Sequence, residues 1–91
     1  MTILIVERVS AGLRGELSRW MLEVKAGVYV GRVAAPVREA LWQRAVQGRR
    51  NGAVVMIFRA ETSQGYDIWV YGERSRLPAS FDGLTLIRQV Q

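Results

Sequence analysis

Glu7, at the end of the first apolar run of the chain, is the strongest candidate for chemistry in this sequence. The 91 residues include no histidine and no cysteine, which excludes the usual general base at neutral pH, a thiol nucleophile and cysteine-rich zinc sites. Catalysis would therefore need carboxylates, which could hold a hard cation such as Mg²⁺. Glu7 could do so jointly with its twofold mate across a dimer interface. Its neighbours Arg8, Val9 and Ser10 offer few oxygen ligands, so the alternative is a plain strand-end carboxylate paired with an arginine.

The basic residues are almost all arginine. Of 13 basic residues, 12 are Arg and one, Lys25, is Lys; with 8 acidic residues the net charge is +5 and the pI is near 10.7. A guanidinium group binds phosphate oxygens through two parallel hydrogen bonds and stays charged at any working pH. This composition favours a nucleic-acid partner, and the alternative is a positive surface that only promotes solubility.

Two arginines, Arg8 and Arg14, flank the expected start of the first helix. Free N–H groups at a helix N-terminus attract phosphate, so these side chains are predicted to contact a nucleic-acid backbone; the alternative is two solvated charges. Arg38, on the second helix, is predicted to extend the same basic surface. Three further arginines of that helix are interpreted as ordinary surface charge: Arg44, Arg49 and Arg50.

Hydrophobic periodicity predicts the elements that position these residues. The first half is expected to contain a strand at Ile3–Val6, a helix whose apolar stripe runs from Leu13 to Val24, and a short strand at Val28–Val30. A second helix from Pro36 to Asn51 should follow, and then a strand at Ala53–Phe58, a hairpin loop at Glu61–Gly65 and a strand at Tyr66–Tyr71. An irregular connection at Gly72–Asp82 and a last strand at Gly83–Ile87 complete the expected order. This order predicts one domain, residues 1–91, with an α+β fold: a ferredoxin-like sandwich of two helices on a small mixed sheet, with an additional C-terminal strand.

The stretch between the helices is unusually short. Gly27 occupies the position of a helix C-cap glycine, which leaves one minimal strand with a glycine-bent continuation at residues 32–33. Among the tryptophans, Trp20 is predicted to lie in the core on the first helical stripe. Trp42 is assigned to the buried side of the second helix, and Trp69 is expected to be half exposed at an interface.

The hydrophobic content of 49% is more than one small core readily covers. We therefore expect a homodimer that buries part of this surface. The apolar residues 1–6 are too few for a signal peptide or a membrane span, so a soluble cytoplasmic protein without a membrane partner is expected.

Several collinear motifs together resemble one protein family. They are the run WMLEVKAGVYVG at residues 20–31, Glu7 after the first strand, Leu13-Arg14-Gly15, Val37-Arg38-Glu39 with Trp42, Val54-Val55-Met56 and Asp82-Gly83-Leu84. On these motifs, over the whole chain, the sequence resembles CRISPR-associated protein 2 in its Cascade-linked (type I-E) subtype.

The resemblance implies a ferredoxin-like homodimer that bridges two dimers of the integrase, CRISPR-associated protein 1, and holds duplex DNA during spacer acquisition. It supports Arg14 and Arg76 as DNA contacts. Arg74 is also predicted to contact DNA, although it is displaced by one residue from the basic pair that the family often carries before Pro78. It also implies that the C-terminal segment docks the integrase by β-addition, through Leu84, Leu86, Ile87 and Val90; the alternative is a simple edge strand.

Two other functions stay open at this point. Some family members are described as metal-dependent nucleases acting on RNA or DNA, which would give a magnesium-dependent endonuclease using Glu7, although many relatives carry aspartate at that position. The second is a small regulator that binds a metabolite. The scaffold interpretation needs no cofactor, and it is the one we adopt.

Overall fold

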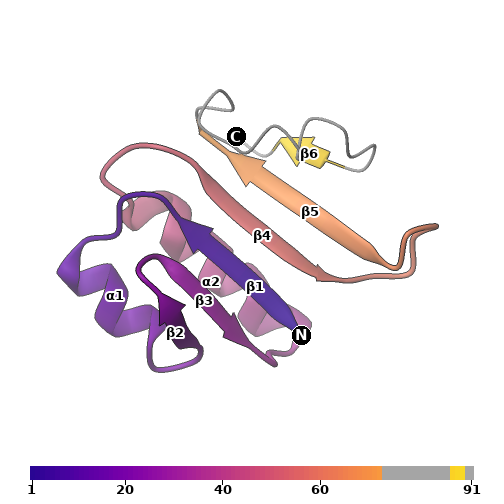
Figure 1. Cartoon of the computed structure of the whole chain (residues 1–91), viewed down its shortest axis with the longest axis horizontal. Helices are drawn as coiled ribbons and strands as arrows, with labels where there is room; N and C mark the ends of the chain where they lie inside the picture. Colours follow the sequence, from indigo (N-terminus) through magenta and orange to yellow (C-terminus); the bar gives the residue numbers. More distant parts are fainter. Residues whose placement is uncertain (73–86, 90–91) are drawn as a thin grey trace.

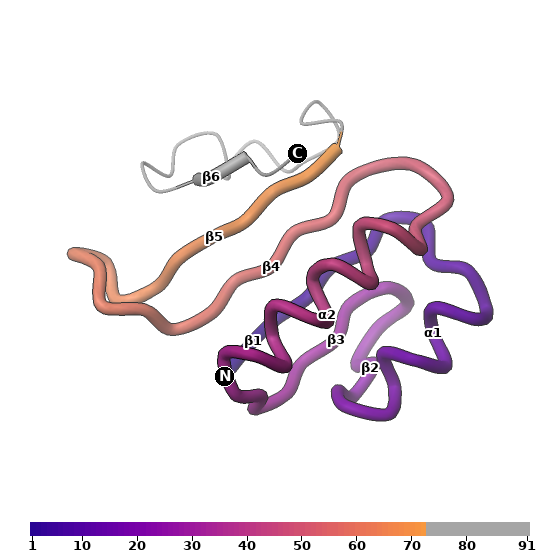
Figure 2. Tube along the Cα trace, turned by 180° about the vertical axis from the view of Figure 1, so that it is seen from behind, coloured from indigo at the N-terminus to yellow at the C-terminus, as the bar shows by residue number. Residues whose placement is uncertain are grey.

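Within the described residues, which are 1–72 and the backbone of 87–89, the computed structural model has two helices and six strands (Figure 1). In chain order they are β1 (Thr2–Val6), α1 (Ala11–Leu17), β2 (Leu22–Lys25), β3 (Val28–Gly31), α2 (Ala35–Gly48), β4 (Val54–Arg59), β5 (Tyr66–Tyr71) and β6 (Ile87–Gln89). Both helices pack on one face of a single sheet, and Figure 2 shows α2 crossing that face. The fold is the predicted α+β, ferredoxin-like arrangement.

The sheet has the strand order β2-β3-β1-β4-β5-β6, which places the first strand in its interior. β1 pairs antiparallel with β3 on one side and with β4 on the other, so that Leu4 lies opposite both Tyr29 and Met56. β4 and β5 form an antiparallel hairpin, and β6 pairs parallel to β5. The sheet is therefore mixed, as predicted.

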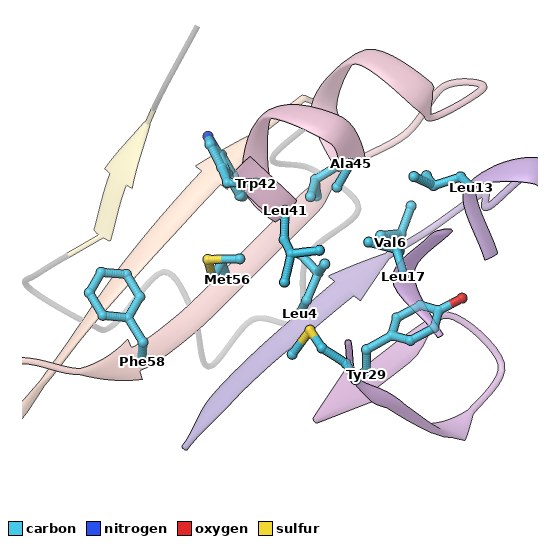
Figure 3. Packing of buried hydrophobic residues seen from close by; sticks show 12 residues of the cluster. Leu4, Val6, Leu13, Leu17, Tyr29, Leu41, Trp42, Ala45, Met56 and Phe58 are labelled. Carbon is cyan, nitrogen blue, oxygen red and sulfur yellow. The ribbon is translucent and has the colours of Figure 1, made fainter. Parts of the chain in front are cut away.

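The core fills the space between the sheet and the helices (Figure 3). Alternate residues of a strand point to the same face, so Leu4 and Val6 of β1 both face the helices and are buried. The opposite, outer face carries a second cluster. It consists of buried Val55, Ile68 and Val70, with half-buried Ile5, Ile57 and Tyr66 against them.

The first helix is shorter than predicted. α1 ends at Leu17, with Ser18 as its C-cap, whereas the apolar stripe predicted a helix as far as Val24. Apolar residues at positions 20, 21, 22 and 24 fit a helix as well as a strand, so periodicity alone could not decide between them. Gly12 and Gly15 weaken the helix, and the following residues gain a β-sheet partner instead.

Two strands, not one, lie between the helices. β2 and β3 form an antiparallel hairpin in which Leu22 lies opposite Val30 and Glu23 opposite Tyr29. The predicted continuation at residues 32–33 is wrong, because the partner strand precedes β3. Gly27 is likewise no helix cap: it lies between β2 and β3 with φ of 79°, and its N–H donates a 2.9 Å hydrogen bond to the Glu23 carboxylate.

The tryptophans divide differently than expected. Trp20 follows the end of α1 and is 57% exposed, so its assignment to the core was wrong. Trp42 is buried, as predicted. Trp69 is half buried and lies on the helix-facing side of β5, where its ring makes edge contacts with those of Trp42 and Phe58.

The second half of the described fold agrees with the prediction more closely. Pro36 lies in the first turn of α2, and β4 and β5 match the expected strands within a residue. The last strand is shifted: β6 begins at Ile87, where the predicted strand ended. Neither of the two helices in the described part of the chain has the length and hydropathy needed to cross a membrane.

Replacing Gly27 with alanine should destabilise the protein by about 1–3 kcal/mol. The alanine would have to adopt a positive φ, and its Cβ would press directly against the carbonyl oxygen of Val6. Chemical denaturation should show a lower midpoint for Gly27→Ala. Gly15→Ala is the control, since a Cβ there meets nothing within 4 Å and alanine favours the helix. Equal midpoints for Gly27→Ala and the unmodified protein would contradict this description of the turn.

Candidate nucleic-acid interface

Three loops meet at the carboxyl end of β1, at the same end of the sheet (Figure 1). The N–H of Val6 donates to the carbonyl oxygen of Gly27 at 2.8 Å, which attaches the β2–β3 turn. The N–H of Glu7 donates to the carbonyl oxygen of Ala53 at 3.1 Å, which attaches the segment before β4. Main-chain hydrogen bonds therefore fix the relative positions of the loops that carry several of the predicted site residues.

Glu7 has a structural role in this arrangement. Its Oε1 accepts a 2.8 Å hydrogen bond from the N–H of Ala53, so side chain and main chain together bind one residue of the neighbouring segment. No group of three or more His, Cys, Asp or Glu side chains placed to hold a metal occurs among the described residues.

Arg8 and Arg14 both line a small cavity beside Glu7, with a volume of about 230 Å³. The structure thus brings together the two arginines that flank the expected start of the first helix. The expected contribution of the helix N-terminus is small, however. α1 has only seven residues, and the Ser10 side chain already accepts a hydrogen bond from the N–H of Leu13.

Arg14 is held by an acidic partner that the sequence analysis did not identify. Its Nε lies 3.2 Å from the Glu23 carboxylate, which also accepts the hydrogen bond from Gly27. The Gly27 N–H above all, and then the Arg14 charge, lower the pKa of Glu23. Arg14 therefore points into the site in a fixed position, with part of its charge balanced. In the predicted helix Arg14 and Glu23 would lie about 13 Å apart along the helix axis, so the sequence analysis did not foresee this pair.

Two other arginines contact aromatic rings, at opposite ends of the sheet. Tyr71, under Arg49, lies opposite Val54 at this end, whereas Phe58, under Arg38, lies opposite Thr2 at the start of β1, so Arg38 is not part of this site. The guanidinium carbon of Arg38 lies 3.9 Å from the centroid of Phe58. The side chain is half buried, and its buried Nε has no hydrogen-bond partner among the described residues. Arg49 lies over Tyr71 and donates hydrogen bonds to the carbonyl oxygens of Val46 and Gly52. Arg49 is thus a structural residue at the end of α2, not the ordinary surface charge that was predicted.

The remaining predicted residues fall in two groups. Arg44 forms a two-pronged ion pair with Glu16, with contacts of 2.6 and 2.7 Å, and this pair lowers the pKa of the Glu16 carboxyl. The other group lies outside the residues whose side chains the structure describes: Arg74, Arg76, Leu84, Leu86, Ile87 and Val90.

The comparison with known families agrees with the fold. A family model described as CRISPR-associated protein (Cas_Cas2CT1978) matches residues 1–86. The matched region contains both helices and β1 to β5, together with the three loops at the end of β1. The family model therefore matches the same part of the chain that forms the described α+β fold.

The lowered pKa of Glu23 predicts a pH-dependent contribution to stability. Because the folded pKa lies below the unfolded one, the unfolded chain binds more protons in acid. The stabilisation from Glu23 is thus present at neutral pH and is lost as the pH falls below about 4.5 through the folded pKa. Thermal melts of the unmodified protein and of Glu23→Gln should differ at pH 7 and converge in acid. A constant difference across that range would contradict the prediction.

Proposed function

The chain belongs to the Cas2-type family of CRISPR-associated proteins, and from that membership we propose that it is a structural subunit of the spacer-acquisition complex. In this role a homodimer bridges two dimers of the integrase, CRISPR-associated protein 1, and holds duplex DNA through arginine. The motifs at residues 20–31 further support the Cascade-linked subtype. The complex acts in the cytoplasm, where the CRISPR array is located.

The observation that carries the proposal is which side chains lie together at the end of β1. Arg8 and Arg14 line it together, while the Glu7 carboxylate is bonded to the main chain of Ala53. Two guanidinium groups fit phosphate oxygens, and the described residues contain no cluster of three or more acidic, histidine or cysteine side chains placed to hold a metal ion. The local chemistry favours binding of a nucleic-acid backbone over its cleavage.

We assign the dimer interface to the outer face of the sheet. Both helices in the described part of the chain lie on the opposite face. On the outer face Val55, Ile68 and Val70 are already buried within the single chain, so the apolar side chains open to a partner are those of the neighbouring positions. Ile5 and Ile57 are half buried there, and Leu22, in the same face of β2, is 67% exposed. An apolar sheet face that spans several strands can bury a large area against its twofold copy.

DNA recognition in this proposal is independent of sequence. The candidate contacts at the end of β1 are Arg8, in the loop after that strand, and Arg14 in the short helix α1, and neither described helix presents a basic face suited to the major groove. The contacts are therefore with phosphates, which position a duplex without reading its bases.

Integration assays distinguish this scaffold from a nuclease that depends on Glu7. In the complex with the integrase, Glu7→Gln keeps a hydrogen-bond acceptor for Ala53 and should leave integration of a labelled duplex near normal. Arg14→Glu and Arg76→Glu should each reduce integration at least about tenfold, because a phosphate attraction becomes a repulsion. Loss of integration in Glu7→Gln, with active arginine variants, would replace the scaffold by metal chemistry at Glu7.

Sedimentation should show a dimer at micromolar concentration without any partner protein. Ile57→Asp introduces a charge on the outer sheet face and should shift the equilibrium to monomer. Trp20→Asp, which alters an exposed apolar residue outside the β-sheet, is the control and should remain dimeric. A monomeric unmodified protein, or a dimer lost only in the Trp20 variant, would contradict the assigned interface.

A further inference from the structure

Arg50 lies directly beside Arg8, although the two residues are far apart in the sequence. The N–H of Arg50 donates a 3.3 Å hydrogen bond to the carbonyl oxygen of Arg8. Next to this contact, Glu7 and Ala53 join the same two segments by a main-chain and a side-chain hydrogen bond of 3.1 and 2.8 Å. Figure 1 shows both loops, after β1 and before β4, at one end of the sheet. These hydrogen bonds therefore hold the backbones of Arg8 and Arg50 next to each other.

Neither of these two guanidinium groups is paired with a carboxylate of the described residues. Both residues are exposed, and neither has an ion-pair or ring partner in the part of the chain that the structure describes. In contrast, Arg14 and Arg44 have glutamate partners, and Arg49, the sequence neighbour of Arg50, is fixed over Tyr71. Two adjacent like charges repel unless an anion lies between them.

Arg50 adds a positive charge next to the cavity beside Glu7. Arg8 lines this cavity together with Arg14, whose charge is partly balanced by Glu23, and the main-chain contact to Arg8 brings Arg50 to the same end of the sheet. An anion with several oxygen acceptors suits such a pair of forked donors.

We propose that Arg50 and Arg8 together bind one phosphate group of the duplex DNA backbone. The inference rests on the proposed scaffold function and adds to it a residue that neither the sequence analysis nor the family resemblance assigns. Free phosphate has the same chemistry as the backbone group. The duplex is favoured because Arg14, which lines the same cavity as Arg8, can contact a further phosphate along the strand.

The test compares Arg50→Gln with Arg59→Gln in the complex with the integrase. Arg59 is exposed at the far end of β4, and its substitution removes the same charge. Binding of a fluorescent mixed-sequence duplex is measured over a range of salt concentrations. Arg50→Gln should weaken binding about tenfold at moderate salt and reduce the slope of log affinity against log salt by about 1. Arg59→Gln should change neither quantity, and both variants should melt at the temperature of the unmodified protein.

A double variant tests whether the two side chains share one phosphate. If they do, Arg8→Gln combined with Arg50→Gln should lose little more affinity than the stronger single variant. Additive losses would overturn the shared site, as would an Arg50→Gln complex that binds like Arg59→Gln. Competition of the duplex by inorganic phosphate at equal phosphate concentration would show a free-anion site instead. An unmodified complex without affinity for the duplex would contradict the proposed function itself.

Discussion

The hydrogen bonds at the carboxyl end of β1 determine where the chemically important residues of this protein lie. β1 is the interior strand on which β3 and β4 pair, so the turn after β2 and the segment before β4 must both approach its end. Val6 binds the turn after β2 through a main-chain hydrogen bond to Gly27, and Glu7 binds the segment before β4 through main-chain and side-chain hydrogen bonds to Ala53. Arg8 emerges from this junction in a position that the backbone fixes.

A protein with 12 arginines uses them in different ways, and their partners show which ones can bind a ligand. Arg49 stabilises the end of α2 through two carbonyl oxygens and a ring, and Arg38 packs over Phe58. Arg44 connects α2 to α1 through Glu16. Arg8 and Arg50 have no such partner among the described residues, so their charge remains directed to solvent. Net charge alone favours an anionic partner, and the contacts of each arginine distinguish those used within the fold from those available to such a partner.

The sequence predicted the second helix, β4, β5 and the fold class, because continuous apolar strands and an N-terminal proline are strong local signals. It failed at residues 18–25, where helix and strand periodicities coincide and the choice depends on pairing with β3. That error concealed Glu23 as the partner of Arg14. The proximity of Arg50 to Arg8 was equally inaccessible, because it arises from a tertiary hydrogen bond and not from spacing along the chain.

Arginine side-chain NMR during titration with a short mixed-sequence duplex tests this account most directly, since each Nε–H reports on its own surroundings. The account predicts that the Nε–H signals of Arg8, Arg14 and Arg50 shift together and saturate at one stoichiometry. The signal of Arg44, held by Glu16, should stay in place. Shifts at Arg44 and Arg59, with unchanged signals from Arg8 and Arg50, would show that the DNA binds elsewhere on the protein.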